Sequence, residues 1–421
     1  MTTASSSRLR PERRLLAITA LAMSAVLLAA SPAAADSIRD RQYWLSQYGF
    51  TQVWASTKGA GVKVAVIDTG IDGSVAELRG AVVDGADMSG IGRADGQKPV
   101  GTDSDHGTMV ASVLAGRGIG SGSGVLGVAP AVSLLSVSVA FGDSGSTVSN
   151  DDQIAAGVRW AVDHGAKVIN MSLTRNTPDW PVSWDSAFQY AFDHDVVIVA
   201  AAGNRGSGTE EVGAPATIPG VLTVAGVDRN ENASFDASSQ GITIAVSAPS
   251  EDLVGVVPGG GYVQWSGTSA AAPIVSGLVA LVRAEHPELD ANNVIQRVIA
   301  TATAKAGQQV PSPVYGYGLI NPMGALFDSV APVTANPMGS LADWVRLHRR
   351  TDGGTASPQP SVAPNIQADP PAQRFAVSLL PTAQSLAYVT VPLAVLTVFG
   401  TLAVLLGIGA TRRFSRNAPK E

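Results

Sequence analysis

The chain has 421 residues, a formal net charge of −6 and no cysteine. The absence of cysteine excludes a thiol nucleophile, a thiolate metal site and a disulfide framework. Eight of its basic residues lie in two short clusters near the ends, so the central part is more acidic than the whole chain and nucleic acid is not expected as a partner.

The N-terminal end is typical of a secretory signal peptide. Four arginines precede the apolar run 15–30, and Ala33-Ala34-Ala35 provides a cleavage site before Asp36. An uncleaved anchor helix is the alternative, but the apolar run is short for a membrane span. We therefore expect a signal peptide over residues 1–35, followed by a short N-terminal extension over 36–57.

Short apolar runs alternate with amphipathic segments between residues 58 and 330. The continuous runs are typical of buried strands, and the amphipathic segments have apolar residues at helical spacing. This alternation predicts an α/β fold with a mostly parallel, doubly wound sheet and helices on both faces. The expected strands are 62–67, 132–139, 167–173, 196–202 and 221–227, and the expected helices are 152–165, 182–195 and 269–286.

The C-terminal part of the chain differs in composition from the rest. The stretch 351–372 is rich in Pro, Ser and Ala, which is typical of an extended stalk. A later segment is uncharged and long enough to cross a bilayer, and the basic residues after it place the C-terminus in the cytoplasm. The expected divisions are a folded domain over 58–350, a stalk over 351–385, a transmembrane helix over 386–410 and a basic cytoplasmic tail over 411–421.

Three residues with catalytic chemistry fall where the expected strands lead into helices, which is where such sheets place their sites. Asp68 ends the first strand, although a lone carboxylate there could equally satisfy the turn at Thr69-Gly70. His106 lies where a polar loop becomes a helix, a position at which a lone histidine is more often structural. Ser269 opens a very apolar helix, where helix capping alone would explain a serine.

Together these residues have the chemistry of an activated serine. His106 would accept the proton of Ser269 and later protonate the leaving amine, while Asp68 would fix the imidazole tautomer and stabilise imidazolium. Asn204 follows the strand 196–202 and is the candidate oxyanion donor, together with the Ser269 backbone N–H, although Asn-Arg-Gly would also suit an ordinary turn. We predict these four residues as catalytic.

Two other motifs are weaker. The stretch GDSGS (142–146) contains Ser144 but lacks a second glycine after it and lies close behind His106, so we interpret it as a loop. The stretch GSGVLG (122–127) fits G-x-G-x-x-G but precedes a strand-like run instead of opening a helix.

The segments VAVIDTGID, DHGTMVA, AAGN and GTSAAAPIVSG, in that order, make the chain resemble the subtilisin-like serine peptidases, or subtilases, over roughly 55–330. The resemblance implies a subtilisin-like fold, a triad of Asp68, His106 and Ser269, and Asn204 in the oxyanion hole. The family allows a structural calcium ion, but no loop here has the ligand pattern of one. We therefore predict no metal-binding residue and no required cofactor.

The resemblance also implies which residues bind the substrate. Ser172, Leu173 and Thr174 would lie on a strand that pairs with the substrate backbone. Most family members have glycine in place of Thr174, so we expect the added side chain to narrow the cleft. The residues implied to border the pocket for the residue before the cut are Ala201, Ala202 and Gly203.

The order of signal peptide, short extension, stalk and membrane span resembles the mycosins, membrane-anchored subtilases associated with type VII secretion. This resemblance implies a single-pass type I protein of the plasma membrane, with an extracytoplasmic domain that hydrolyses peptide bonds of exported proteins. Its partners would be protein or peptide substrates, the plasma membrane and a type VII secretion membrane complex. The alternative is a structural component of a secretion complex, with proteolysis secondary or lost. An esterase or lipase is disfavoured because no G-x-S-x-G elbow surrounds Ser269.

Overall fold

A seven-stranded sheet organises the domain in the computed structural model, which describes residues 38–120, 122–142, 144–349 and 373–375. The strand order is β2-β5-β1-β6-β7-β8-β9, and every neighbouring pair is parallel. The strands are β1 (Lys63–Asp68), β2 (Val82–Asp87), β5 (Ser133–Ser138), β6 (Val168–Met171), β7 (Val197–Ala201), β8 (Leu222–Val227) and β9 (Ile244–Pro249).

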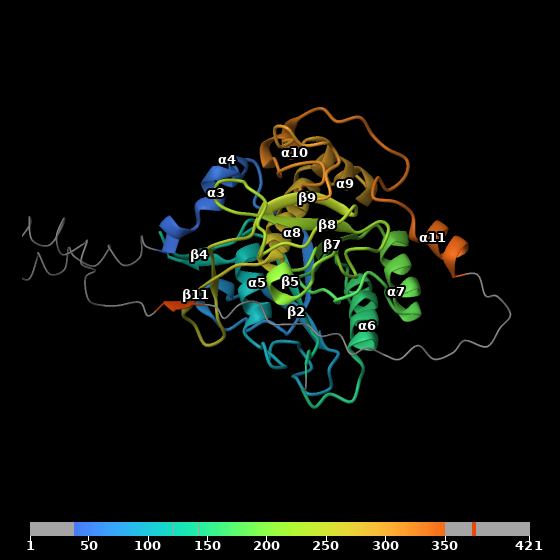
Figure 1. The fold of residues 1–421 in the computed structure, drawn as a ribbon. Helices are drawn as coiled ribbons and strands as arrows, with labels where there is room; N and C mark the ends of the chain where they lie inside the picture. Colours follow the sequence, from blue (N-terminus) through green and yellow to red (C-terminus); the bar gives the residue numbers. More distant parts are fainter. Residues whose placement is uncertain (1–37, 121, 143, 350–372, 376–421) are drawn as a thin grey trace, which may run out of the picture. The chain divides into compact units, whose positions relative to one another are not determined.

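Helices cover both faces of this sheet, as the alternation of strands and helices predicts (Figure 1). Successive strand residues point to opposite faces, so Val64 and Val66 of β1 join one core while Ala65 and Ile67 join the other. The first core also contains α5 and α8, and the second contains α6 and α7. The helices are α3 (Tyr43–Gln47), α4 (Phe50–Val53), α5 (His106–Ala115), α6 (Asn150–Asp163), α7 (Val182–Asp193), α8 (Thr268–Glu285), α9 (Ala291–Ala300), α10 (Pro322–Phe327) and α11 (Leu341–His348), with short 3-10 turns η1 (Ala76–Leu78) and η2 (Arg205–Ser207).

The N-terminal extension is part of the first core. Trp44 and Phe50 in α3 and α4 are completely buried. Trp54 donates its indole N–H to the Val128 carbonyl at 2.8 Å. The Gln42 side chain pairs in both directions with the backbone of Leu126, at 2.7 and 3.0 Å. The extension therefore packs as an element of the domain.

Two small antiparallel sheets flank the large one. The first pairs β3 (Arg117–Ile119) with β4 (Ser123–Leu126). The second has the order β10-β11-β12, formed by β10 (Leu253–Val256), β11 (Tyr262–Trp265) and β12 (Gln373–Phe375). The strand β12 falls inside the stretch expected as a stalk, and β11 ends shortly before the start of α8.

Several expectations concern residues outside the described part of the chain. They are the signal peptide (1–35), most of the stalk, the transmembrane helix (386–410) and the basic tail (411–421), which stay predictions. Within the described residues, none of the helices has both the length and the apolar character that crossing a membrane requires.

Candidate active site

The end of β1 places Asp68 at the carboxyl edge of the sheet. The side chain is 1% exposed, and its Oδ1 accepts the backbone N–H of Thr69 at 2.7 Å. The Asp68 carbonyl accepts the N–H of Val139, just after β5, at 2.8 Å. The carboxylate is thus oriented by the turn that follows the strand.

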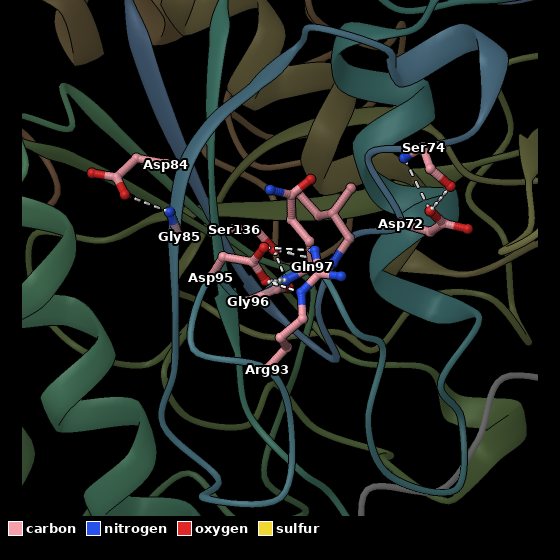
Figure 2. A network of polar contacts seen from close by, with 10 residues as sticks. Asp72, Ser74, Asp84, Gly85, Arg93, Asp95, Gly96, Gln97 and Ser136 are labelled. Atoms are coloured by element: carbon pink, nitrogen blue, oxygen red, sulfur yellow. Dashed lines mark hydrogen bonds and ion pairs between the residues drawn. The ribbon is translucent and has the colours of Figure 1, made fainter.

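A loop packed over β5 fixes this turn (Figure 2). The Ser136 hydroxyl of β5 donates to the Gly96 carbonyl at 2.6 Å and accepts the N–H of Ile71 at 3.0 Å. Gly96 has φ +64°, and a Cβ there would lie 2.2 Å from the Ser136 carbonyl, so only glycine fits. An ion pair of 2.6 Å between Arg93 and Asp95 braces the loop, and hydrogen bonding to Arg93 lowers the pKa of Asp95.

His106 is the first residue of α5 and points its Nδ1 at Asp68. The distances from Nδ1 to Oδ1 and Oδ2 are 2.8 and 3.0 Å, and the imidazole is 16% exposed. Donation from Nδ1–H to a carboxylate assigns the tautomer in which Nε2 carries the lone pair for proton transfer. The helix start is docked on the β1 turn, because the Gly107 N–H donates to the Thr69 hydroxyl at 2.9 Å.

Trp265, at the end of β11, packs against His106. Its ring lies edge-on to that of His106, with centroids 5.7 Å apart and planes at 83°. The indole is 3% exposed. The imidazole therefore contacts an aromatic ring as well as a carboxylate, and the sequence motifs do not reveal the aromatic contact.

Ser269 is the second residue of α8, and Gly267 occupies the N-cap position. Capping therefore does not explain this serine. The side chain is 8% exposed. Its hydroxyl donates to the Ser172 carbonyl at 3.1 Å, and the Ser172 hydroxyl donates to the Ser269 carbonyl at 2.8 Å. These reciprocal bonds hold the start of α8 at the end of β6, the strand next to β1.

A buried chain of polar groups supports this junction. The Asn170 amide of β6 donates to the Ser172 hydroxyl at 3.0 Å and accepts from the Ser276 hydroxyl of α8 at 2.8 Å. All three side chains are buried, so the hydrogen bonds satisfy groups that would otherwise be costly to bury. The network fixes where the first turn of α8 lies relative to the sheet.

Asn204 follows β7 and is 8% exposed. Its Oδ1 accepts the Thr268 N–H at 2.7 Å and lies 3.0 Å from the Thr268 hydroxyl. That hydroxyl also accepts the Gly203 N–H at 3.0 Å and lies 3.1 Å from the Gly203 carbonyl. Because Oδ1 is held by Thr268, the Nδ2 amide points away from it. Thr268 is thus a positioning residue that the sequence analysis did not identify.

The expected substrate-binding residues lie at the ends of β6 and β7. Leu173 is almost fully buried, and the Thr174 hydroxyl donates to the Arg175 carbonyl at 3.0 Å. The side chains of Ala201 and Ala202 pack into the cores on opposite faces of the sheet. Assignment of these residues, together with Ser172 and Gly203, to substrate binding stays a prediction.

No group of three or more His, Asp or Glu side chains that could hold a metal ion occurs among the described residues. The described site instead combines a carboxylate-imidazole pair, a serine hydroxyl and amide donors at the start of a helix. The first N–H groups of a helix have no intrahelical acceptor, so the Ser269 N–H is available as a donor. This set can perform nucleophilic acyl transfer.

Comparison with known proteins places this geometry in a family. The model of the subtilase family matches residues 59–318. Subtilisin DY of Bacillus licheniformis is 39% identical over 267 residues, which are 63% of this chain and 90% of that protein. The crystal structure of MycP1 from Mycobacterium smegmatis matches with a TM-score of 0.58 and 29% identity, over 71% of this chain and 86% of that one. The structure of MycP1 from the ESX-1 type VII secretion system matches with a TM-score of 0.59 and 30% identity, over 70% and 88%.

Proposed function

Because the chain belongs to the subtilase family, it is a subtilisin-like serine endopeptidase, and we propose that Asp68, His106 and Ser269 form its catalytic triad. One observation carries this proposal: His106 Nδ1 lies 2.8 Å from the buried Asp68 carboxylate. Ser269 is held at the neighbouring strand of the same sheet edge by its bonds to Ser172.

In the proposed reaction, Ser269 Oγ attacks the scissile carbonyl carbon and its proton passes to His106 Nε2. The hydroxyl donates to the Ser172 carbonyl in this structure, so it must turn toward the imidazole for this step. Asp68 stabilises the imidazolium that forms. His106 then protonates the leaving amine, and a water molecule activated by the same imidazole hydrolyses the acyl-enzyme.

Two donors would stabilise the negative charge on the substrate oxygen. They are the Asn204 carboxamide and the Ser269 backbone N–H, both at the N-terminus of α8, where the helix dipole also favours negative charge. This assignment of Asn204 is supported by Thr268, whose N–H and hydroxyl contact the Oδ1 atom of Asn204. The amide therefore needs no large rearrangement when the charge develops.

The place of action is a second part of the proposal. Protein substrates are expected for a subtilase, and we propose that this enzyme acts on exported proteins at the outer face of the plasma membrane, in association with type VII secretion. The charge and hydropathy pattern of the chain ends supports the membrane location. The likeness to MycP1 supports the secretion role, although the chain is also similar to subtilisin DY, at 39% identity.

The test of the triad is labelling with a fluorophosphonate probe, followed by peptide mass spectrometry of the full chain. The probe reacts with an activated serine, so we expect the adduct on Ser269. Ser269→Ala should abolish labelling, and His106→Ala should reduce it strongly because the base is lost.

Ser144 provides an internal control. It lies in the Gly-Ser-rich loop 142–146, which contains neither Asp68 nor His106. An adduct on Ser144, or undiminished labelling of Ser269 in a folded His106→Ala variant, would contradict the proposed triad. Near-ultraviolet circular dichroism establishes that each variant is folded before labelling is compared.

A further inference from the structure

The outer edge of β11 is covered by a segment from far along the chain. β11 pairs antiparallel with β10 on one edge and with β12 on the other. The second register places Gln264 opposite Gln373, and Tyr262 opposite Phe375. Without β12, the backbone N–H and C=O groups on this edge of β11 would lack strand partners, which makes the edge a natural binding site for an extended segment.

β11 is a rigid template because its side chains are fixed by other elements. Val263 and Trp265 are buried in the first core. The Tyr262 hydroxyl donates at 2.7 Å to Glu77, a buried carboxylate in η1. Gln264 donates to Asp252 at 2.6 Å. Elements other than β12 therefore hold β11 in position.

The N-terminal segment begins at the same corner of the domain. Arg39 donates to the Ser123 carbonyl of β4 at 3.1 Å. Burial lowers the pKa of Arg39, and the charges of Tyr262 and Glu77 partly oppose this shift. Figure 1 shows the first described turn and β12 on the same side of the domain, beside β11.

We propose that residues 373–375 are an anchoring strand, which binds the outer edge of β11 and ties the C-terminal segment to the corner where the N-terminal segment begins. The consequence of this anchoring for the position of the membrane rests on the proposed function, which includes a transmembrane helix over residues 386–410. A free stalk over 351–385 could extend to ~120 Å, whereas only about ten residues, 376–385, would link the docked strand to the span, a reach of ~35 Å.

The short link would determine which substrates the enzyme reaches. Phe375 pairs with Tyr262 at one end of β11, and Trp265 at the other end contacts His106, so the strand to which β12 binds also reaches the catalytic machinery. The domain would then cut exported chains close to the point at which they leave the membrane. A long free stalk would instead allow cleavage far from the bilayer.

Disulfide trapping in the full chain, in its membrane, tests the strand pairing. The protein has no cysteine, so introduced pairs have no background. In the Gln264→Cys/Gln373→Cys variant, the two residues face each other across the ladder with a Cα separation of about 4.5–5.5 Å, which suits a disulfide. The matched control is Gln264→Cys/Gln367→Cys, with the same residue types and a second site outside β12.

We expect the 264/373 pair to oxidise about tenfold faster or more than the 264/367 pair, because strand pairing raises its effective concentration. Labelling of Ser269 by the fluorophosphonate probe confirms that both variants are folded. Equal oxidation rates would mean that the segment is not held on β11, and the inference would be wrong.

Alkaline extraction of the same membranes separates this inference from the proposed function. Equal cross-linking in a chain that resists extraction overturns the anchoring strand and leaves the membrane span standing. Selective cross-linking in a chain that alkali releases supports the strand and overturns the span. Selective cross-linking in a chain that resists extraction supports both.

Discussion

At the scale of single residues, the start of α8 contains a positioning residue as well as the proposed nucleophile. Ser269 follows Thr268, whose hydroxyl and N–H hold both Gly203 and Asn204. The sequence identifies Asn204 because an amide after a strand is a recognisable oxyanion donor. It does not identify Thr268, because a threonine at a helix start looks like a cap and its partners lie at the end of another strand.

Removing Asn204, the proposed oxyanion donor, should slow the chemical step with little effect on substrate binding. We expect Asn204→Ala to lower kcat by about 10²- to 10³-fold, the loss that deletion of such a donor causes in subtilisin. KM should change little, since the donor acts on charge that develops in the transition state. Steady-state kinetics on a chromogenic peptide measures both constants, and a loss confined to KM would argue for a role in ground-state binding.

Thr268→Val should disturb the same donor indirectly. The change keeps the size of the side chain but removes the hydroxyl, leaving the buried Gly203 N–H without its acceptor, at a cost of about 1–3 kcal/mol. We expect kcat to fall about tenfold, because part of this free energy is lost from the stabilisation of the transition state. The matched variant Thr268→Ser retains the hydroxyl and should restore most of kcat. If Ser and Val variants are equally impaired, the methyl group rather than the hydroxyl is what matters.

At the scale of secondary-structure elements, Asp195 links the helices α7, α8 and α9. It follows α7 and accepts hydrogen bonds from Arg283 of α8 at 3.0 Å and from Lys167 at 3.1 Å. Its Oδ1 also accepts the Ala291 N–H at the start of α9, at 2.6 Å. One carboxylate thus ties the end of α8 to the first turn of α9, and the guanidinium of Arg283 is itself buried.

This junction should make stability depend on pH. Burial alone raises the pKa of Asp195, but its bonds to Arg283 and Lys167 outweigh burial and lower the pKa below 3.8. A carboxylate with a lowered pKa stabilises the fold above the unfolded-state pKa and loses this contribution as the pH falls through the folded-state value. We expect Asp195→Asn to cost about 1–2 kcal/mol at pH 7, because the buried Arg283 loses its charged partner while the 37% exposure of Asp195 lets solvent screen the pair, and the loss should become smaller as the pH falls to 3.

Urea denaturation at the two pH values measures this difference. Asp193→Asn is the matched control, since Asp193 lies at the end of α7 and contacts only Gln189 among the interactions described for it. An equal loss in both variants, or a loss for Asp195→Asn that does not shrink at low pH, would contradict the assigned role.

The elements themselves were predictable where burial leaves a continuous apolar run. The five expected strands correspond to β1, β5, β6, β7 and β8, and the three expected helices to α6, α7 and α8. β2 was missed because it is a half-exposed edge strand that contains Asp84 and Gly85. β9 was missed because its apolar run is short and ends in Pro249, a residue that argues against a strand in the sequence. Cross-element contacts such as Ser172 with Ser269 depend on tertiary packing, which periodicity does not encode.

At the scale of the whole molecule, the N-terminal extension and the catalytic domain form one core. No strand pattern begins before residue 58, so residues 36–57 look separate from the domain in the sequence. The structure shows Trp44 and Phe50 in the same buried cluster as the α5 and α8 helices. The elements that carry His106 and Ser269 therefore pack in a core to which the extension contributes two of its largest side chains.

Loss of the extension should therefore unfold the domain and not activate it. We expect Trp44→Ala to cost about 3–5 kcal/mol, since truncation leaves a large cavity in the core, and deletion of residues 36–57 to prevent stable folding. Ser46→Ala, at an exposed position of the same helix where the hydroxyl donates to the nearby Tyr43 carbonyl, should change stability by less than about 0.5 kcal/mol. Thermal unfolding measures each variant, and probe labelling of Ser269 reports whether the site survives. A stable, more reactive deletion protein would instead identify the extension as a removable inhibitory segment, which is incompatible with the burial of Trp44.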